Sequence, residues 1–245
     1  MRIEEYLAGL PADLMSGDAA ELPRRALEEA LGFAGVAGES FCHVGCGGGE
    51  GLAAALRMGA KSALGVDSDP RMAERARAAA PGARVVCADA LEADISGSSL
   101  VLFWFADPGV TEQMVQRFDG MDGARVLTLW GPLPGCLPDE VRFPYVLTRT
   151  PPRRAGSVRE QVRAVFGTDC VDFVTAWEHA ERYTRAVSPP GSKNDRFLTI
   201  IQTLSIWTSA RAMGVACGDG IPDPIRAYAG IMREHFGIEF GHLLE

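Results

Sequence analysis

The sequence predicts an α/β fold in which a doubly wound, mostly parallel sheet is covered by helices on both faces. Apolar strand-like segments alternate with helical segments between residues 40 and 130, which is the pattern of a parallel sheet. The strand segments are continuously apolar, as expected of strands buried on both faces. Glycines and acidic residues follow these segments directly, so they fall at the carboxyl ends of the strands, where such sheets bind ligands.

The individual elements follow from apolar runs, periodicity and breakers. Strands are expected at residues 41–44, 63–66, 84–87, 100–105 and 125–130, and helices at 50–58, 70–80 and 110–118. Pro70 suits the first turn of its helix. After residue 130 the pattern predicts a strand at 143–148, mostly helical structure over 158–187 with a break near Gly167, and helices at 195–213 and 224–236.

These elements divide the chain into three expected parts. Residues 1–38 form an N-terminal helical segment, in which apolar residues between Leu22 and Leu31 recur at helical spacing. Residues 39–150 form the sheet domain. Residues 151–245 form a mostly helical C-terminal extension, which we expect to act as a cap over a substrate.

Composition limits the partners. The formal net charge of −8 argues against nucleic acid as the main partner, because binding to phosphates needs a positive surface. The longest uncharged run, residues 197–210, is too short and too polar for a bilayer, which needs about 20 apolar residues. Residues 1–10 lack the basic start and apolar core of a signal peptide. We therefore expect no membrane partner, and the oligomeric state is left open.

The cysteines are scattered and form no Cys-x-x-Cys pair. Several lie in apolar runs, where free cysteine behaves as a small hydrophobic residue. We expect all of them to be reduced, in agreement with a cytoplasmic location, and we expect no metal site. The residues concerned are Cys42, Cys46, Cys87, Cys136, Cys170 and Cys217.

A glycine cluster marks the first strand-to-helix turn. Gly45, Gly47 and Gly49 form a G-x-G-x-G pattern, and glycine lets a backbone approach a ligand closely. A dinucleotide fingerprint would need glycine at position 50, where Glu50 would repel a pyrophosphate. No Gly-Lys-Ser/Thr follows, which excludes a Walker loop. A ligand with a sulfonium and an amino group tolerates an acid here.

Four successive segments resemble the motifs of class I S-adenosylmethionine-dependent methyltransferases, which have a Rossmann-like fold. They are residues 41–49, 64–69, 85–91 and 100–108, and the resemblance extends over residues 39–130. It implies that S-adenosylmethionine is the cofactor and S-adenosylhomocysteine the product. A weaker similarity, through residues 100–105 and 123–126, points to the seven-strand protein-lysine methyltransferases of archaea and mitochondria.

The same resemblance implies roles for single residues. The loop containing Gly45, Cys46 and Gly47 would pass under the methionine part of the cofactor. The carboxylate of Asp67 would accept hydrogen bonds from both ribose hydroxyls, for which its two oxygens are suited. The adenine and the transferred methyl group would be bordered by Ser68, Asp89, Ala90 and Phe105. The ordinary alternatives are a helix N-cap for Asp67 and a turn residue for Asp89.

One position departs from the family. An acidic residue usually stands two positions before the first glycine, where this chain has His43. The departure leaves open how the amino group of the cofactor is held, and Glu50 is the candidate that compensates.

Asp107 is the candidate catalytic residue, because it follows the fourth strand segment, where amino-group methyltransferases often carry Asn/Asp-Pro-Pro-aromatic. Pro108 matches that motif, but Gly109 and Val110 do not complete it, so Asp107 as a helix cap is the alternative. The leading prediction is methylation of a protein amine, with lysine first. The alternatives are a small-molecule methyltransferase whose pocket the C-terminal helices close, and a protein that binds S-adenosylmethionine without catalysis.

The extension carries further candidates. An arginine-rich stretch from Arg149 to Arg163 either grips an acidic substrate or is a solvated surface. His179 either faces the active site or is an ordinary surface residue, and Glu178 and Arg182 are spaced for an i,i+4 ion pair. A polar cluster at residues 192–196 suits a lid hinge or a helix cap.

Overall fold

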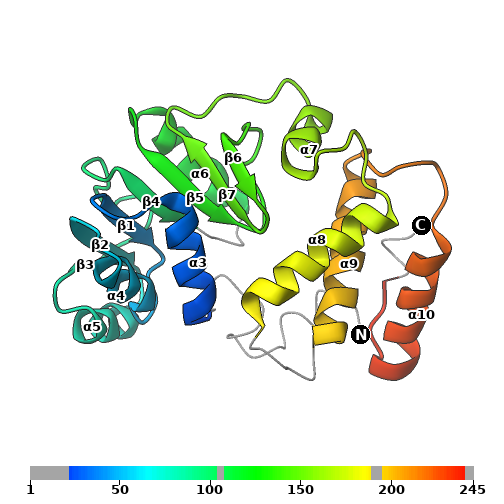
Figure 1. The fold of residues 1–245 in the computed structure, drawn as a ribbon, viewed down its shortest axis with the longest axis horizontal. Coiled ribbons are helices and arrows are strands. Elements are labelled where there is room, and N and C mark those ends of the chain that lie inside the picture. Colours follow the sequence, from blue (N-terminus) through cyan, green and yellow to red (C-terminus); the bar gives the residue numbers. More distant parts are fainter. Residues whose placement is uncertain (1–21, 104–107, 189–194, 241–245) are drawn as a thin grey trace.

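A computed structural model describes residues 22–103, 108–188 and 195–240. In these residues seven strands form one sheet in the order β3-β2-β1-β4-β5-β7-β6. The strands are β1 (Ser40–Val44), β2 (Ser62–Asp67), β3 (Arg84–Cys87), β4 (Leu100–Phe103), β5 (Arg125–Leu129), β6 (Glu140–Arg142) and β7 (Tyr145–Arg149). The predicted doubly wound, mostly parallel sheet is confirmed (Figure 1).

Strand direction fixes where a ligand can bind. Strands β3, β2, β1, β4 and β5 pair in parallel, whereas β7 runs antiparallel to both β5 and β6. The order reverses between β1 and β4, since β2 continues on one side of β1 and β4 lies on the other. Such a switch point opens a crevice at the carboxyl ends of the strands.

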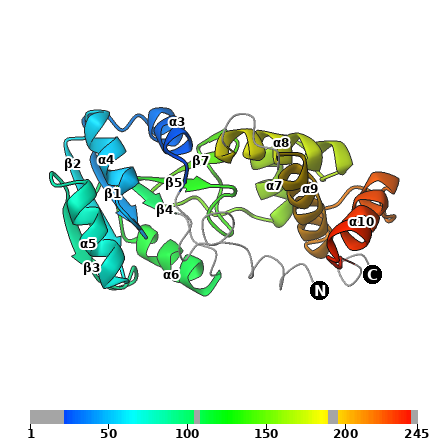
Figure 2. The ribbon, with the colours of Figure 1, turned by 90° about the horizontal axis from the view of Figure 1, so that it is seen from below.

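Alternate residues of the central strands face the two helical layers. Leu100 and Leu102 of β4 belong to a core with helices α3 (Arg24–Ala34), α4 (Glu50–Arg57) and α5 (Pro70–Ala79). Val101 and Phe103 belong to a second core on the opposite face, with helix α6 (Pro108–Asp119). Figure 2 shows α3 and α4 on one side of the sheet and α6 on the other. Burial on both faces explains why this strand is apolar throughout.

The C-terminal extension has a core of its own around Trp207, which is fully buried. Its helices are α7 (Val158–Phe166), α8 (Phe173–Val187), α9 (Asp195–Ala212) and α10 (Asp223–Phe236). Ser157 and Asp172 cap the N-termini of α7 and α8 through their side chains. The end of α8 packs on α3, with Ala186 in the core that α3 forms with the sheet. The extension therefore contacts α3 and also the sheet domain itself, since Trp130 packs on Tyr183 and Phe143 packs on Phe166 and His179. The predicted divisions at residues 38 and 150 stay predictions.

Several boundaries differ from the predicted ones. The predicted strand at 143–148 corresponds to β7, and the preceding β6 was not predicted because two of its three residues are charged. The predicted break near Gly167 is confirmed, since Gly167 ends α7 with a positive φ of 71°. Within the described parts of the chain, every helix is too short or too polar to cross a lipid bilayer.

The expectation that every cysteine is reduced was wrong for one pair. Cys170 and Cys217 form a disulfide across a sequence separation of 47 residues. An isolated bridge between Val171 and Ala216 brings the segment before α8 beside the segment after α9, a long-range pairing that cysteine spacing does not reveal. Because disulfides are rare in reducing compartments, the bond removes one reason for expecting a cytoplasmic location.

Candidate functional site

The glycine loop closes over the end of β2. The amides of Gly45 and Cys46 both donate to the carbonyl oxygen of Val66, at 2.8 and 3.0 Å. Gly49, with a φ of 91°, begins α4 so close to α5 that a Cβ would lie 2.7 Å from the Cα of Ala76. Glycine is therefore required there by both backbone conformation and packing. The loop lies at the carboxyl end of β1, where the strand order reverses.

Asp67 ties this loop to the following turn. One carboxylate oxygen accepts the Gly47 amide at 2.8 Å, and the other accepts the Asp69 amide at 3.0 Å. The N-cap of α5 is Asp69, which accepts the Arg71 amide at 2.8 Å, so the capping alternative proposed for Asp67 does not apply. Each carboxylate oxygen retains a second lone pair, and the residue is only half-buried. The carboxylate can therefore accept further hydrogen bonds from a ligand.

The residues expected near adenine lie along the next strand ends. Asp89 is exposed after β3, and its carboxylate accepts the Leu91 amide at 2.7 Å in the manner of a turn aspartate. Ser68 is exposed beside Asp67, and Ala90 is partly buried. The guanidinium of Arg117 donates to the carbonyl oxygen of Ala90 and holds this turn against α6. The turn role of Asp89 leaves its exposed carboxylate available to a ligand as well.

His43 lies beneath the start of α4. Its Nδ1 is buried and has no hydrogen-bond partner among the described residues, and a Cβ on Gly51 would lie 2.6 Å from that atom. Burial lowers the pKa of His43 to about 4, so the imidazole is neutral at neutral pH. His43 therefore supplies no negative charge in place of the usual acid. Glu50 is an exposed residue in the first turn of α4, next to the loop.

Two predicted site residues, Phe105 and Asp107, lie outside the described residues, and so does most of the polar cluster at 192–196. Their roles stay predictions.

Most of the arginine-rich stretch after residue 149 is neutralised locally. Arg154 pairs with Asp119, Arg163 pairs with Asp169, and Arg153 lies 3.7 Å from Asp139. These pairs favour the interpretation as a solvated surface.

His179 has a packing role. It is buried against the rings of Phe143 and Phe166, with its Nδ1 2.8 Å from the carbonyl oxygen of Thr175. The expected pair of Glu178 and Arg182 is present at 3.9 Å.

A second concave feature at this edge was missed by sequence reasoning. A pocket of about 490 Å³ opens between α3, the β6–β7 turn and α8. Its charged lining consists of Glu29 and four arginines, Arg25, Arg142, Arg182 and Arg185, and we call it the arginine pocket. The arginines come from three separate segments, so no single stretch of sequence signals them.

The residues of this site lie in a part of the chain that is similar to known methyltransferases. Residues 41–118 match a family of methyltransferase domains, and these residues contain the glycine loop, Asp67 and Asp89. Residues 41–118 thus match a methyltransferase domain, and the sheet around them has the Rossmann-like fold of class I methyltransferases. Methyltransferase domains of this class use S-adenosylmethionine, so the cofactor indicated by the sequence agrees with the match. A comparison with curated proteins finds no significant match.

Solved structures of methyltransferases are similar to part of this chain at low sequence identity. An RNA methyltransferase from Salinibacter ruber, in complex with S-adenosyl-L-homocysteine, is 20% identical with a TM-score of 0.51, and the match covers 56% of this chain and 98% of that one. A methyltransferase from Mesorhizobium loti is 24% identical with a TM-score of 0.37, over 51% of this chain and 58% of that one. Magnesium protoporphyrin IX methyltransferase from Synechocystis is 16% identical with a TM-score of 0.37, over 43% of this chain and 55% of that one. The chain therefore spans little more than half the length of the last two.

Proposed function

We propose that the chain is an S-adenosylmethionine-dependent methyltransferase whose cofactor lies on the glycine loop, across the carboxyl ends of β1 to β3. The observation that carries the proposal is the placement of Asp67, whose carboxylate holds the glycine loop and remains half-buried at the switch point. The loop itself fits such a ligand, because Gly45 is exposed at the same edge. Asp67 would bind the ribose, Ser68, Asp89 and Ala90 would surround the adenine, and Phe105 would border the methyl group.

The chemistry requires mainly alignment of the acceptor. The cofactor supplies an electrophilic methyl group, and methyl transfer is a direct displacement in which positioning lowers the barrier. A neutral amine needs no general base before attack, although it loses a proton afterwards. We propose Asp107, after β4, as the residue that accepts a hydrogen bond from the acceptor.

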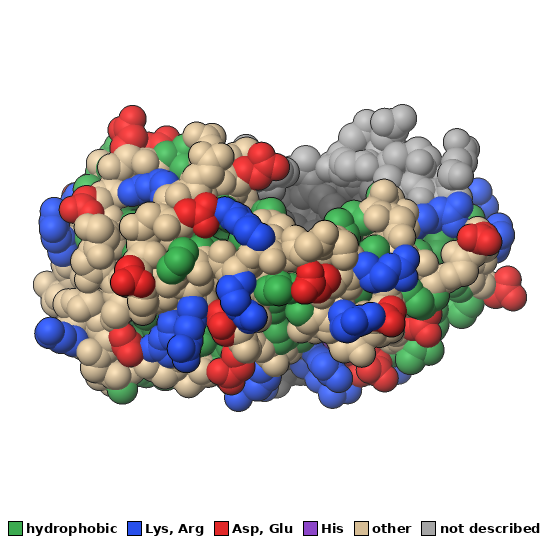
Figure 3. Space-filling view, turned by 90° about the horizontal axis from the view of Figure 1, so that it is seen from above, with side chains coloured by type: hydrophobic (Ala, Val, Ile, Leu, Met, Phe, Trp, Pro, Cys, Tyr) green, Lys and Arg blue, Asp and Glu red, His purple; other side chains and the backbone are tan. Residues whose placement is uncertain are grey.

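The second part of the proposal concerns the chemical class of the methyl acceptor. A protein lysine and a small molecule are both compatible with the domain, and they differ in whether the C-terminal helices help to enclose the site. Helix α8 of the extension supplies Arg182, Arg185 and Ala186 to the pocket at the sheet edge. That contribution supports a small-molecule acceptor over the protein lysine expected first. Figure 3 supports the expectation against nucleic acid, since basic and acidic side chains are interspersed over the face that it shows.

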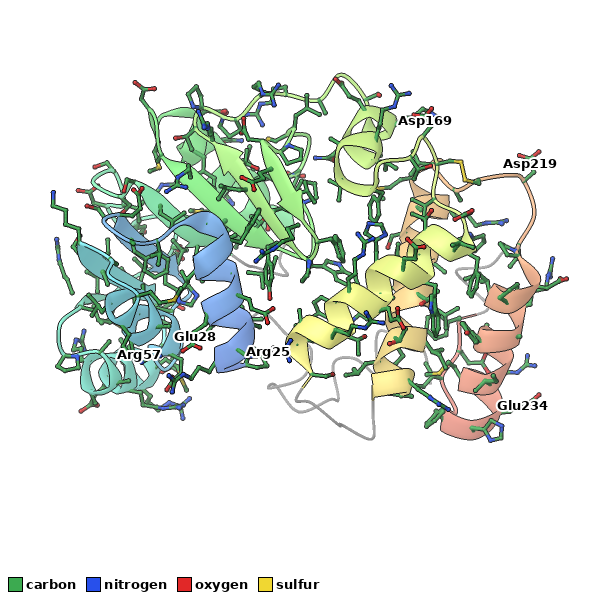
Figure 4. All side chains as sticks on the ribbon, viewed as in Figure 1. Arg25, Glu28, Arg57, Asp169, Asp219 and Glu234 are labelled. Atoms are coloured by element: carbon green, nitrogen blue, oxygen red, sulfur yellow. A yellow bond between two sulfur atoms is a disulfide. The ribbon has the colours of Figure 1, made fainter. Side chains whose placement is uncertain are left out.

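The test is calorimetric titration of S-adenosylmethionine and S-adenosylhomocysteine into three proteins. We expect micromolar binding to the wild type and at least a tenfold loss in Asp67→Asn, because an amide lacks the second acceptor oxygen and the charge. The control is Asp219→Ala, an exposed aspartate labelled in Figure 4 far from the glycine loop. Absence of binding by the folded wild type would contradict the proposal. Equal binding by Asp67→Asn would contradict the assigned role of Asp67.

A further inference from the structure

The arginine pocket concentrates positive charge in an acidic protein. The chain has a net charge of −8, yet four arginines and a single acid, Glu29, supply the charged lining of this pocket. The lining also includes the consecutive residues Phe143, Pro144 and Tyr145. A volume of about 490 Å³ is within the range of sites for small organic ligands, roughly 300–1,000 Å³.

The arginines are available to a ligand. Arg25 is paired with Glu29 at 2.8 Å and Arg185 with Glu181 at 3.0 Å, but their side chains are 58% and 72% exposed. Such exposed pairs contribute little and exchange readily for a stronger partner. Within the described residues, Arg142 contacts the Glu29 backbone carbonyl at 3.4 Å and the Phe33 ring rather than a carboxylate. Figure 4 shows Arg25 at the end of α3 that lies toward α8.

Strand register places the pocket at the cofactor edge of the sheet. Tyr145 begins β7 opposite Leu129, the last residue of β5, and Arg142 ends β6 opposite Tyr145. These residues therefore share the edge formed by the carboxyl ends of β1 and β2. The site of methyl transfer in the proposed function lies at the end of β4, two strands from β7 in the sheet order. At about 4.8 Å per strand, the ends of β4 and β7 are roughly 10 Å apart within the sheet.

We propose that the arginine pocket binds the anionic group of the methyl acceptor, and that the acceptor is a small organic anion with an apolar body and a carboxylate or phosphate group. This inference rests on the proposed function and specifies its substrate class. Arginine suits such a ligand because its planar fork donates two parallel hydrogen bonds to a carboxylate or phosphate. The apolar part of the lining, at Phe143, Pro144 and Tyr145, would lie beside the apolar body.

The size of the pocket favours a small anion over a nucleic acid. Glu29 lies within the pocket, and Glu178 and Glu181 accompany the arginines of α8. A phosphate backbone that ran beyond the pocket would meet Glu178 and Glu181, whereas one carboxylate or phosphate group within the pocket would meet four arginines and one acid, Glu29. Extended nucleic-acid binding requires a continuous positive surface.

The experiment measures binding of benzoate, phenyl phosphate and neutral benzamide to the full chain by calorimetry, in the presence of saturating S-adenosylhomocysteine. We expect one of the two anions to bind and benzamide not to bind. The double variant Arg182→Gln/Arg185→Gln should weaken anion binding at least tenfold, while Arg226→Gln on the exposed side of α10 should leave it unchanged. Cofactor-product affinity should be equal in all variants, which also reports that they fold.

Three kinds of result would overturn the inference. The first is binding without the expected selectivity, either of benzamide as tightly as the anions or of the anions equally by the wild type and the double variant. The second is loss of anion binding when S-adenosylhomocysteine is added, which would place the anion in the cofactor site. The third is an RNA oligonucleotide that binds through the same arginines more tightly than phenyl phosphate. Failure of S-adenosylhomocysteine to bind at all would instead contradict the proposed function, while anion binding would still report on the pocket.

Discussion

His43 occupies the position where related domains usually carry an acid, and its environment explains what that substitution does. The imidazole is packed beneath Gly51 with its Nδ1 buried. A protonated ring there would be charged and desolvated, which is costly unless a partner is present. The domain thus replaces a negative charge with a neutral ring, and the first turn of α4 brings Glu50 to the same loop.

Titration of His43 should make the protein less stable in mild acid. Burial lowers the pKa of folded His43 from its ordinary value of 6.5 to about 4, so between these values the unfolded chain binds a proton that the folded chain does not. The contribution of the neutral imidazole to the free energy of unfolding is fully present above pH 6.5 and is lost as the pH falls to about 4. At about 1.4 kcal/mol per pKa unit, the loss in unfolding free energy is up to roughly 3 kcal/mol.

The measurement is the free energy of unfolding in urea between pH 7 and pH 4. His43→Gln should remove much of the decline, because its amide does not titrate, whereas His235→Gln at the exposed end of α10 should retain it. Identical pH profiles for the wild type and His43→Gln would show that the ring titrates as it does in water.

At the scale of elements, the sequence allowed prediction where local signals and burial agree. Strand β3 has the predicted bounds, and α4 and α5 begin where Glu50 and Pro70 indicate. The glycine loop and Asp67 could be predicted because each leaves a local signal in the sequence. Positive φ values favour glycine, and the carboxylate comes at the end of an apolar strand segment. The arginine pocket and the disulfide were not found, because each joins segments that only the tertiary packing of α8 brings together.

The disulfide should stabilise the helical extension. It closes a loop that contains α8 and α9, with Cys170 and Cys217 separated by 47 residues. Cross-linking a loop of this length lowers the entropy of the unfolded chain, with a typical stabilisation of about 2–4 kcal/mol. Cys170→Ser, or reduction of the wild type, should therefore lower the unfolding free energy by about that amount in chemical denaturation.

Cys87→Ser is the matched control, since Cys87 is an exposed free thiol on the sheet domain. If Cys170→Ser and Cys87→Ser are equally stable under oxidising conditions, the cysteine pair makes no stabilising bond. The predicted cytoplasmic location would then regain the support that the disulfide removes.

At the scale of the whole molecule, the packing of α8 on α3 helps to join the C-terminal extension to the sheet domain. The extension has a core around Trp207, but Ala186 near the end of α8 belongs to the core that α3 shares with the sheet. Figure 1 shows the extension lying beside the β7 side of the sheet with α8 reaching toward α3. A ligand that stabilises the sheet edge should therefore stabilise the extension as well.

Hydrogen exchange with and without cofactor tests this coupling. A ligand present at 100 times its dissociation constant stabilises the folded state by about 2.7 kcal/mol. If the molecule unfolds as one unit, amides of β1 and of α9 should both gain protection of that size, because both exchange through the same global opening. Protection confined to β1, with α9 unchanged, would mean that the extension opens independently of the sheet. The arginine pocket would then lose its α8 wall while the cofactor remained bound, so the coupling decides whether one folded state can hold cofactor and acceptor together.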